Sequence, residues 1–514
     1  MCAALNEECY LKLCKVCDRL LLIPDATIEH VAIVWLHIIR EHPVFLDSYV
    51  DLFKSISSIN TIRRRWKRIA RHKVGWCWQL VKSVYLGRLP WFSSKELPVQ
   101  IDFLFVSHMI DVSQAGQAVD FYYGGVPNEL VAQGHTAVIT LINHTRHQSG
   151  NLVEKWRGCL VPRVLLSKSL GLLKEFEMHR RLAKESIRLK IFAKRQLPGL
   201  LQRVSQQASQ EALSGGSQTT LRIGEQIHAL VVKHKPRVVV VTHEGHAWER
   251  IIFAAARSAF PAVRCVGYQH AALFRMQHAI RRNLANKYNP DQILTAGIIS
   301  KMQLEHAPNL EGIPVSVLGS NRSPKKVNVI GRTFNQENVN DGGVPACLVI
   351  PEGVASECHI LFEFSLESAR AAPDILFVWR LHPLVSLSTL TAQNPNLRNL
   401  PKNIRWSHVT LEEDIACSRW ALYRGSTAVV QSVVAGLRPI YLQLQDELTI
   451  DPLYELQDWR ISVASTSELQ QIIFADIKIS RFPPEEEIKH ARGYCESLFT
   501  PFDVSALTAL SHLA

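Results

Sequence analysis

Three short segments combine acidic, basic and hydroxyl side chains, and each directly follows a run of apolar residues. They are His243-Glu244-Gly245-His246, Arg380-Leu381-His382-Pro383 and Arg424-Gly425-Ser426-Thr427. A carboxylate can accept a proton, and an imidazole can stabilise negative charge that develops on a neighbouring atom. Hydroxyl groups beside an arginine and a glycine can bind a phosphate at the start of a helix. The segments therefore predict proton transfer and anion binding.

The apolar runs that precede these segments are typical of buried strands. Stretches with helical spacing separate them, and this alternation indicates parallel sheets with helices on both faces. In such sheets, ligands bind at the carboxyl ends of the strands, which is where the three segments lie. We expect strands near 103–106, 137–141, 238–241, 263–267, 293–294, 347–350, 375–379, 419–423 and 439–442.

The order of these patterns divides the chain into five parts. We expect a helical extension over 1–95, a Rossmann-like domain over 96–320, a linker over 321–345, a second Rossmann-like domain over 346–490 and a helical tail over 491–514. The first domain contains a basic helical insertion at about 155–210, which ends in a flexible polar tract. The predicted fold class is α/β: a GT-B architecture of two Rossmann-like domains facing a cleft, with a helical N-terminal extension.

The composition favours a folded protein and excludes several classes. Hydrophobic residues make up 47% of the 514 residues and charged residues 20%, which argues against extended disorder. No apolar stretch reaches the roughly 18 to 20 residues that cross a bilayer. The 11 cysteines show no zinc-site or disulfide pattern. We expect a cytoplasmic protein, with a possible peripheral position on the inner face of the cytoplasmic membrane.

The formal net charge of +12 is concentrated in two segments, 63–73 and 179–195. Three interpretations stay open for them: a solvated helix face, contact with an anionic membrane, and nucleic-acid binding. The tryptophans near the first segment favour the membrane, because indole rings rest in the headgroup region. No nucleic-acid module is recognisable, so we expect no nucleic-acid partner.

The order of an acidic-Gly segment, a His-Pro segment and a Ser-Thr segment on two Rossmann-like domains resembles the bacterial sialyltransferases and Kdo transferases that use CMP-activated sugars. The tracts 267–270 and 436–441 also resemble bacterial surface-polysaccharide biosynthesis proteins. The resemblance covers roughly residues 230–460. It implies a metal-independent transferase without a cofactor, which agrees with the lack of an Asp-x-Asp motif.

The resemblance implies that the acidic-Gly segment holds the general base. Sialyltransferases have two acidic residues before the glycine, whereas this chain has His243 and then Glu244, so either residue is a candidate. A carboxylate at a helix start is the alternative reading of Glu244. Glu249 is predicted to contact the acceptor or to form a salt bridge. His270 is predicted on the acceptor side, with packing as the alternative.

The other segments are predicted to bind the donor. His382 would neutralise charge on the departing phosphate. Ser426 and Thr427, with Arg424 and Gly425, would bind that phosphate, although a plain helix cap is the competing interpretation. The remaining donor-side candidates are Glu352, Gly353 and Arg380.

These expectations combine into one function with alternatives. The expected enzyme transfers a sialic-acid-like or Kdo sugar from a CMP-activated donor to a glycan or lipid-linked glycan of a capsule or lipopolysaccharide. A UDP- or GDP-hexose donor, or a CDP-glycerol phosphotransferase, would fit the same fold. A non-catalytic GT-B scaffold in a polysaccharide assembly complex is the alternative from another class, because the fold alone does not fix a function.

Overall fold

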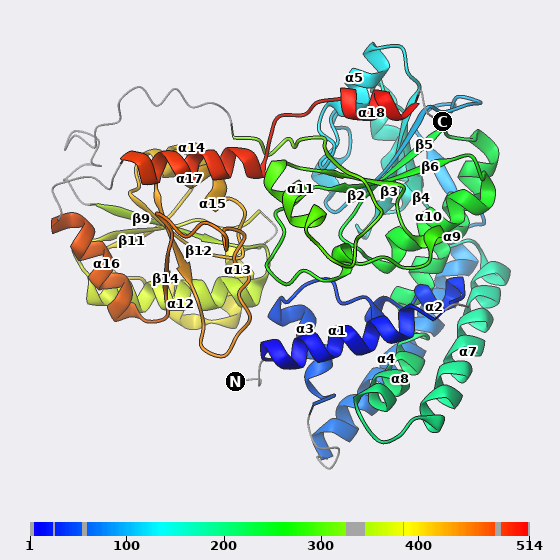
Figure 1. The fold of residues 1–514 in the computed structure, drawn as a ribbon, viewed down its shortest axis with the longest axis horizontal. Coiled ribbons are helices and arrows are strands. Elements are labelled where there is room, and N and C mark those ends of the chain that lie inside the picture. The colour runs from blue at the N-terminus through cyan, green and yellow to red at the C-terminus, as the bar shows by residue number, and fades with distance from the viewer. Residues whose placement is uncertain are drawn as a thin grey trace. The chain divides into compact units, whose positions relative to one another are not determined.

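The computed structural model describes residues 5–23, 26–53, 59–324, 345–383, 385–478 and 485–511. The chain forms two compact units (Figure 1). Unit 1 comprises Met1–His270, Gln277–Asn321 and Pro501–Ala514, and unit 2 comprises Ala271–Met276 and Arg322–Thr500. Most of the predicted linker, residues 325–344, lies outside the described residues. None of the described helices combines the length and the apolar character needed to cross a membrane.

Unit 1 is built on an eight-stranded sheet in which only β1, an edge strand, runs antiparallel to its neighbour. Strands β4, β3, β2, β5, β6 and β7 lie side by side in the order typical of a Rossmann domain, in which the first and fourth strands are central neighbours. The strands in spatial order are β1 (Trp91–Ser93), β4 (Arg163–Leu166), β3 (Ala137–Asn143), β2 (Phe103–Met109), β5 (Val238–Thr242), β6 (Arg264–Gln269), β7 (Gln292–Thr295) and β8 (Val315–Val317).

The central strands of unit 1 are buried on both faces, which explains their continuous apolar sequence. Phe103 and Val240 belong to the core on one face, whereas Leu104 and Val241 belong to the core on the other. The helices of this unit are α1 (Glu7–Leu21), α2 (Ile28–Val31), α3 (Pro43–Val50), α4 (Ile59–Tyr85), α5 (Val126–Ala132), α6 (Ser149–Val153), α7 (Leu172–Arg195), α8 (Leu200–Glu211), α9 (Gly215–His234), α10 (Ala247–Ala259), α11 (Ile298–Glu305) and α18 (Ser505–Ser511).

Unit 2 contains a six-stranded sheet whose strands are all parallel. Its order again places the first strand, β9, beside the fourth, β12, as in a Rossmann domain. The strands in spatial order are β11 (Ile404–Trp406), β10 (Leu376–Trp379), β9 (Ala346–Pro351), β12 (Trp420–Arg424), β13 (Arg438–Leu442) and β14 (Ile461–Val463). The prediction of an α/β fold with two Rossmann-like domains is confirmed.

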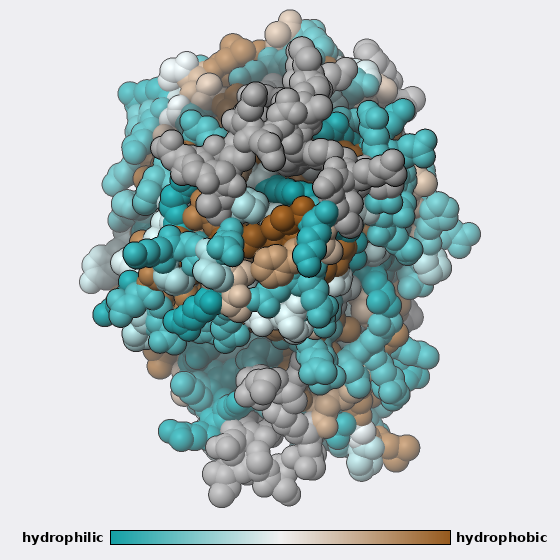
Figure 2. Space-filling model, turned by 90° about the vertical axis from the view of Figure 1, so that its left-hand side faces the viewer, coloured by the Kyte–Doolittle hydropathy of each residue, from teal (hydrophilic) through white to brown (hydrophobic). Residues whose placement is uncertain are grey.

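The helices of unit 2 are α12 (Ala355–Ala371), α13 (Leu387–Gln393), α14 (Leu411–Ala416), α15 (Val429–Val434), α16 (Thr466–Lys478) and α17 (Glu485–Leu498). The view in Figure 2, onto the side of unit 2, is largely hydrophilic with one hydrophobic area near its middle. Among the described residues of this unit, the exposed large apolar side chains are Val409, Phe474 and Ile477. Most exposed apolar side chains that the structure describes therefore belong to unit 1.

The predicted insertion over 155–210 is wrong in its first part, because β4 lies within it. The strand begins with Arg163, which interrupts the apolar pattern although its side chain is buried. Its guanidinium donates to the carbonyl oxygens of Val161 and Ala118 at 3.1 and 2.9 Å. These hydrogen bonds compensate for the loss of water around the charge.

The polar tract that was expected to be flexible is helical. Residues 205–210 of this tract form half of α8, in which Ser205 donates to the carbonyl oxygen of Leu201 at 2.7 Å and Ser209 to that of Gln206 at 2.9 Å. A serine whose hydroxyl group donates to a carbonyl oxygen of the preceding turn can be accommodated in a helix. Ser214 then caps the start of α9.

The predicted C-terminal tail over 491–514 is divided between the units. Helix α17 belongs to unit 2, whereas α18 belongs to unit 1. Leu507 and Leu510 of α18 are buried in the unit 1 core. The prediction of a single tail is therefore wrong, because the last helix completes a core whose other members lie far away in the sequence.

Candidate active site

The carboxyl end of β5 carries the turn of unit 1 that connects the sheet to α10. Gly245 in this turn has a φ of +91°, and an added Cβ would overlap the backbone carbonyl of Ala279. Only glycine combines this conformation with such a close approach. Strand β5 borders β2 at the point where the strand order reverses, which is where open α/β sheets bind ligands.

The carboxylate of Glu249 holds this turn in place. It accepts the backbone N–H groups of Glu244 at 3.0 Å, Gly245 at 2.7 Å and His246 at 2.9 Å. The side chain is 1% exposed, so it does not face solvent. The structure therefore contradicts the prediction that Glu249 contacts an acceptor, since its oxygens are used inside the turn.

His243 lies behind the turn and is fully buried. Its Nδ1 is 2.8 Å from a carboxylate oxygen of Glu249, and its ring packs against Gly267, where an added Cβ would come within 2.9 Å of the ring. A substrate cannot reach this imidazole. The candidate role of His243 as the general base is therefore wrong, and the residue supports the turn from inside.

Glu244 and His246 are the partly exposed members of the turn. Nε2 of His246 lies 3.4 Å from Oε2 of Glu244. Burial raises the pKa of Glu244, but the hydrogen bond with His246 and the neighbouring His270 and Arg40 outweigh burial and hold that pKa below its usual range. Burial lowers the pKa of His246, yet the hydrogen bond to Glu244 and the charges of Glu249 and Glu244 bring the net pKa above its usual value.

Further histidines, which the sequence analysis did not single out, lie near this pair. Nδ1 of His108, in β2, is 2.8 Å from Nε2 of His144, which follows β3. The ring of His108 also meets Trp248 edge-on, with 4.7 Å between centroids. Burial, and then the neighbouring His144, hold the pKa of His108 well below its ordinary value. In the sequence, His108 and His144 each lie at the end of an apolar run that predicts a strand, and this position could have identified them as candidates.

His270 follows β6 at the same edge of the sheet. Its ring meets Tyr122 edge-on at 4.6 Å, and it is one of the groups that lower the pKa of Glu244. The side chain is half-buried. His270 therefore lies near the Glu244–His246 pair, and its role on the acceptor side stays a prediction.

In unit 2, the loops after β9 and β12 meet at the point where the strand order reverses. Glu352 follows β9 and Gly425 follows β12. Gly425 has a φ of +69°, and an added Cβ would lie 2.7 Å from the Glu352 carboxylate. The absence of a side chain at position 425 therefore makes room for this carboxylate.

His382 reaches the same loops from the end of β10. An added Cβ at Gly353 would lie 2.8 Å from the His382 ring, so the imidazole rests directly on the glycine backbone. Burial lowers the pKa of His382, and the nearby Arg322 lowers it further, whereas Glu352 acts in the opposite direction. The imidazole is therefore predominantly neutral at pH 7. Arg322 was not among the residues predicted from the sequence.

Ser426 and Thr427 follow Gly425. Ser426 is buried and Thr427 is half-buried. Their carbonyl oxygens accept the N–H groups of Val429 and Val430 at 3.4 and 3.2 Å, so both residues belong to the turn that starts α15. We call Glu352, Gly353, His382, Gly425 and Ser426 the unit 2 cluster.

Arg424 does not face the unit 2 cluster as an anion-binding group. It is fully buried, with Nε 2.5 Å from Glu357, and it forms a second ion pair with Glu447. It also donates to the carbonyl oxygen of Leu442 at 3.3 Å. The predicted phosphate contact is therefore wrong, because two carboxylates already neutralise this guanidinium.

Arg380 is also engaged elsewhere. Its Nη1 lies 2.7 Å from Oδ2 of Asp414 and 2.8 Å from the carbonyl oxygen of Val409. Asp414 is almost fully buried. These contacts tie Arg380 to the β11–α14 side of the sheet, so the structure does not support its predicted role in donor binding.

No family model matches this sequence, and no curated protein matches it. Similar solved structures include the glycosyltransferase SnogD from Streptomyces nogalater, with 15% identity, 80% of this chain and 99% of that chain covered, and a TM-score of 0.44. The structure of Acinetobacter baumannii MurG is 10% identical in sequence and has a TM-score of 0.44; the match covers 80% of this chain and 100% of that chain. The structure of UDP-GlcNAc 2-epimerase from Neisseria meningitidis bound to UDP-GlcNAc is 15% identical in sequence and has a TM-score of 0.42; the match covers 80% of this chain and 99% of that chain. With TM-scores this low, the reaction has to be inferred from the residues themselves.

Proposed function

We propose that this protein is a glycosyltransferase and that the nucleotide of its activated sugar donor binds to the unit 2 cluster. One observation gives the strongest support for this donor site. The loops that carry Glu352, His382 and Gly425 meet at the point where the strand order of a Rossmann-like sheet reverses. Nucleotides bind at this position in open α/β sheets. A carboxylate suits ribose hydroxyl groups, and an imidazole with hydroxyl groups suits a phosphate.

We further propose a CMP-activated donor carrying a sialic-acid-like or Kdo sugar. Arg424 and Arg380 are held in ion pairs with carboxylates, so the cationic groups near the unit 2 cluster are His382 and Arg322, beside the hydroxyl groups of Ser426 and Thr427. This modest positive charge suits one phosphate better than two. Neutral His382 would take up a proton when the phosphate binds, because a nearby anion raises the pKa of an imidazole.

For the acceptor hydroxyl, we propose that the Glu244–His246 pair receives the proton. The lowered pKa of Glu244 makes its carboxylate a weak proton acceptor, whereas the raised pKa of His246 makes the imidazole the stronger base. The carboxylate of Glu244 would stabilise the imidazolium that forms. Glu249 would act as a positioning residue because it fixes the turn that carries both groups.

The acceptor would be a surface or lipid-linked glycan, reached while the protein contacts an anionic membrane. Helix α4 supports this partner, since Trp66 and Trp78 are 66% and 60% exposed and Arg63, Arg64 and Lys67 are exposed on the same helix. Exposed indole rings beside cationic side chains suit a negatively charged headgroup region.

Calorimetric titration with CMP, CDP, UDP and GDP tests the donor assignment. Selective binding of CMP that is weakened by His382→Ala and by Ser426→Ala, but not by His408→Ala on the exposed surface of the same unit, is the expected result. Tighter binding of UDP, GDP or CDP would overturn the CMP assignment. No binding of any nucleotide would favour a non-catalytic scaffold.

A further inference from the structure

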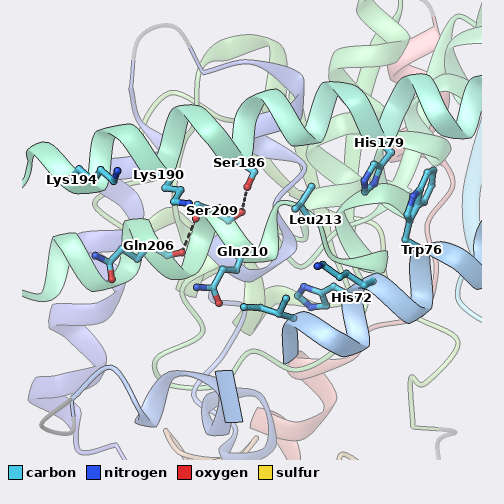
Figure 3. A pocket seen from close by; sticks show the side chains of 12 residues that line it. His72, Trp76, His179, Ser186, Lys190, Lys194, Gln206, Ser209, Gln210 and Leu213 are labelled. Carbon is cyan, nitrogen blue, oxygen red and sulfur yellow. Dashed lines mark hydrogen bonds between the residues drawn. The ribbon is translucent and has the colours of Figure 1, made fainter. Parts of the chain in front are cut away.

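A separate cavity of about 610 Å³ lies in unit 1 between helices α4, α7 and α8 (Figure 3). Its lining comes from these three helices and from the turn that follows α8. The side chains that α4 contributes recur at the spacing of one helical face. The lining residues are Ile69, His72, Lys73, Trp76, His179, Ser186, Lys190, Lys194, Gln206, Ser209, Gln210 and Leu213.

One end of the cavity is aromatic. The rings of Trp76 and His179 are stacked, with 4.0 Å between their centroids and 8° between their planes. Burial lowers the pKa of His179, so its ring is predominantly neutral at pH 7 and adds an aromatic surface rather than a charge. Ile69 and Leu213 extend the apolar part of the lining.

The other end of the cavity is cationic. Lys190 and Lys194 lie one turn apart on α7, next to Gln206 of α8 in Figure 3. A third lining lysine, Lys73, comes from α4, where it lies one turn before Trp76. These lysines form no ion pair with any residue that the structure describes. None of the lining residues is acidic. The cavity therefore favours an anion.

A neighbouring carboxylate does not cancel this charge. Glu211, at the end of α8, has its two carboxylate oxygens 3.7 Å from Nε of Arg68 and 3.7 Å from Nε2 of His72. An arginine thus already balances this carboxylate. The ammonium groups of Lys73, Lys190 and Lys194 remain as the excess charge around the cavity.

Apolar side chains flank the cationic end. Ile187 and Ile191 directly follow the lining residues Ser186 and Lys190, and are 59% and 47% exposed. Because successive residues of an α-helix are about 100° apart around its axis, these side chains border the face that lines the cavity. A ligand whose phosphate lies among the lysines would find exposed apolar surface beside it.

We propose that this cavity binds the phosphate headgroup of an anionic phospholipid, with Lys190 and Lys194 contacting the phosphate and the start of the acyl chains leaving along Ile187 and Ile191. Ammonium groups form charge-assisted hydrogen bonds to phosphate oxygens, and Gln206 and Gln210 can bind the headgroup hydroxyls. This site does not depend on the proposed transferase reaction. It gives the helical part of unit 1 a specific lipid contact in addition to general attraction to a membrane.

The test uses the full-length protein and monomeric dihexanoylphosphatidylglycerol, with binding measured by calorimetry below the micelle concentration. The pocket variant combines Lys73→Gln, Lys190→Gln and Lys194→Gln. The matched control combines Lys155→Gln, Lys184→Gln and Lys233→Gln, which removes the same charge from exposed positions outside the cavity. We expect the pocket variant to bind at least about tenfold more weakly and the control to bind within about twofold of the natural protein.

Two further measurements separate the possible ligands. Gln210→Trp, which fills the cavity without a change of charge, should also weaken lipid binding while the thermal unfolding temperature and CMP binding stay unchanged. Glycerol 3-phosphate reports on the headgroup alone and should bind much more weakly than the lipid. Equal binding of glycerol 3-phosphate, or lipid binding that the pocket variant retains, would overturn the proposal.

Discussion

The imidazole of His246 faces the carboxylate of Glu244, with 3.4 Å between Nε2 and Oε2, at the end of a buried parallel strand. Each group changes the proton affinity of the other: the pKa of the carboxyl is lowered and that of the imidazole is raised, in both cases against the effect of burial. A proton that the imidazole accepts is therefore stabilised by the carboxylate. Glu249 fixes both residues through their backbone N–H groups.

Glu244→Gln is expected to lower the pKa of His246, because the substitution removes the negative charge that stabilises the imidazolium. NMR titration of the histidine ring signals measures this shift directly. Sugar transfer should fall by about 10² to 10⁴, the usual range for the loss of acid–base assistance. Glu177→Gln, at an exposed position of α7, is the control and should change neither quantity. An unchanged His246 titration in Glu244→Gln would refute the coupling.

The sequence predicted the strands of both sheets well where the apolar runs were uninterrupted. The predicted strand at 238–241 corresponds to β5, and the predicted strand at 347–350 corresponds to β9. Strand β4 was missed because buried Arg163 breaks its pattern, and β11 and β14 were missed because each has only three residues. Short edge strands carry too little periodicity to be recognised.

The candidate site was predictable as a set of loops but not as a set of contacts. Strand exits located Glu244, His382 and Gly425 correctly, because parallel strands end at a common edge. Whether a charged side chain faces the site or the interior depends on partners far away in sequence. Arg424 is directed to Glu357, 67 residues before it, and no local pattern shows this.

Arg424→Ala is expected to destabilise unit 2 by about 3 to 5 kcal/mol, because it leaves the buried carboxylate of Glu357 and the half-buried carboxylate of Glu447 without a cation. Chemical denaturation followed by circular dichroism measures the free energy of unfolding. Arg405→Ala removes an exposed arginine from β11 and should change it by less than about 0.5 kcal/mol. Equal stability of the two variants would show that Arg424 is not a structural ion-pair partner.

Gly425→Ala is expected to destabilise the protein by about 1 to 3 kcal/mol and to weaken nucleotide binding. The residue has a φ of +69°, and the new methyl group would lie 2.7 Å from the Glu352 carboxylate and displace it. Gly493→Ala, at an open position of α17, is the matched control and should stabilise the protein by about 0.5 to 1 kcal/mol. Thermal unfolding and nucleotide titration are measured on both variants. Normal nucleotide binding by Gly425→Ala would exclude this turn from the donor site.

His382 should make nucleotide binding depend on pH. Its pKa in the free protein is lowered by burial, so the ring is mostly neutral at pH 7. A bound phosphate raises that pKa, and binding therefore takes up a proton. The affinity should rise as the pH falls from 8 to 6, by at most tenfold per pH unit, between the pKa values of the bound and free protein.

His382→Gln keeps a hydrogen-bonding side chain but cannot be protonated, so its affinity should follow only the titration of the nucleotide itself. The difference between the natural protein and this variant isolates the contribution of the imidazole. His408→Gln, at an exposed position of the same unit, should behave like the natural protein. Calorimetry in two buffers of different ionisation enthalpy measures the proton uptake directly. If His382→Gln takes up as many protons as the natural protein, another group must carry the charge that meets the phosphate.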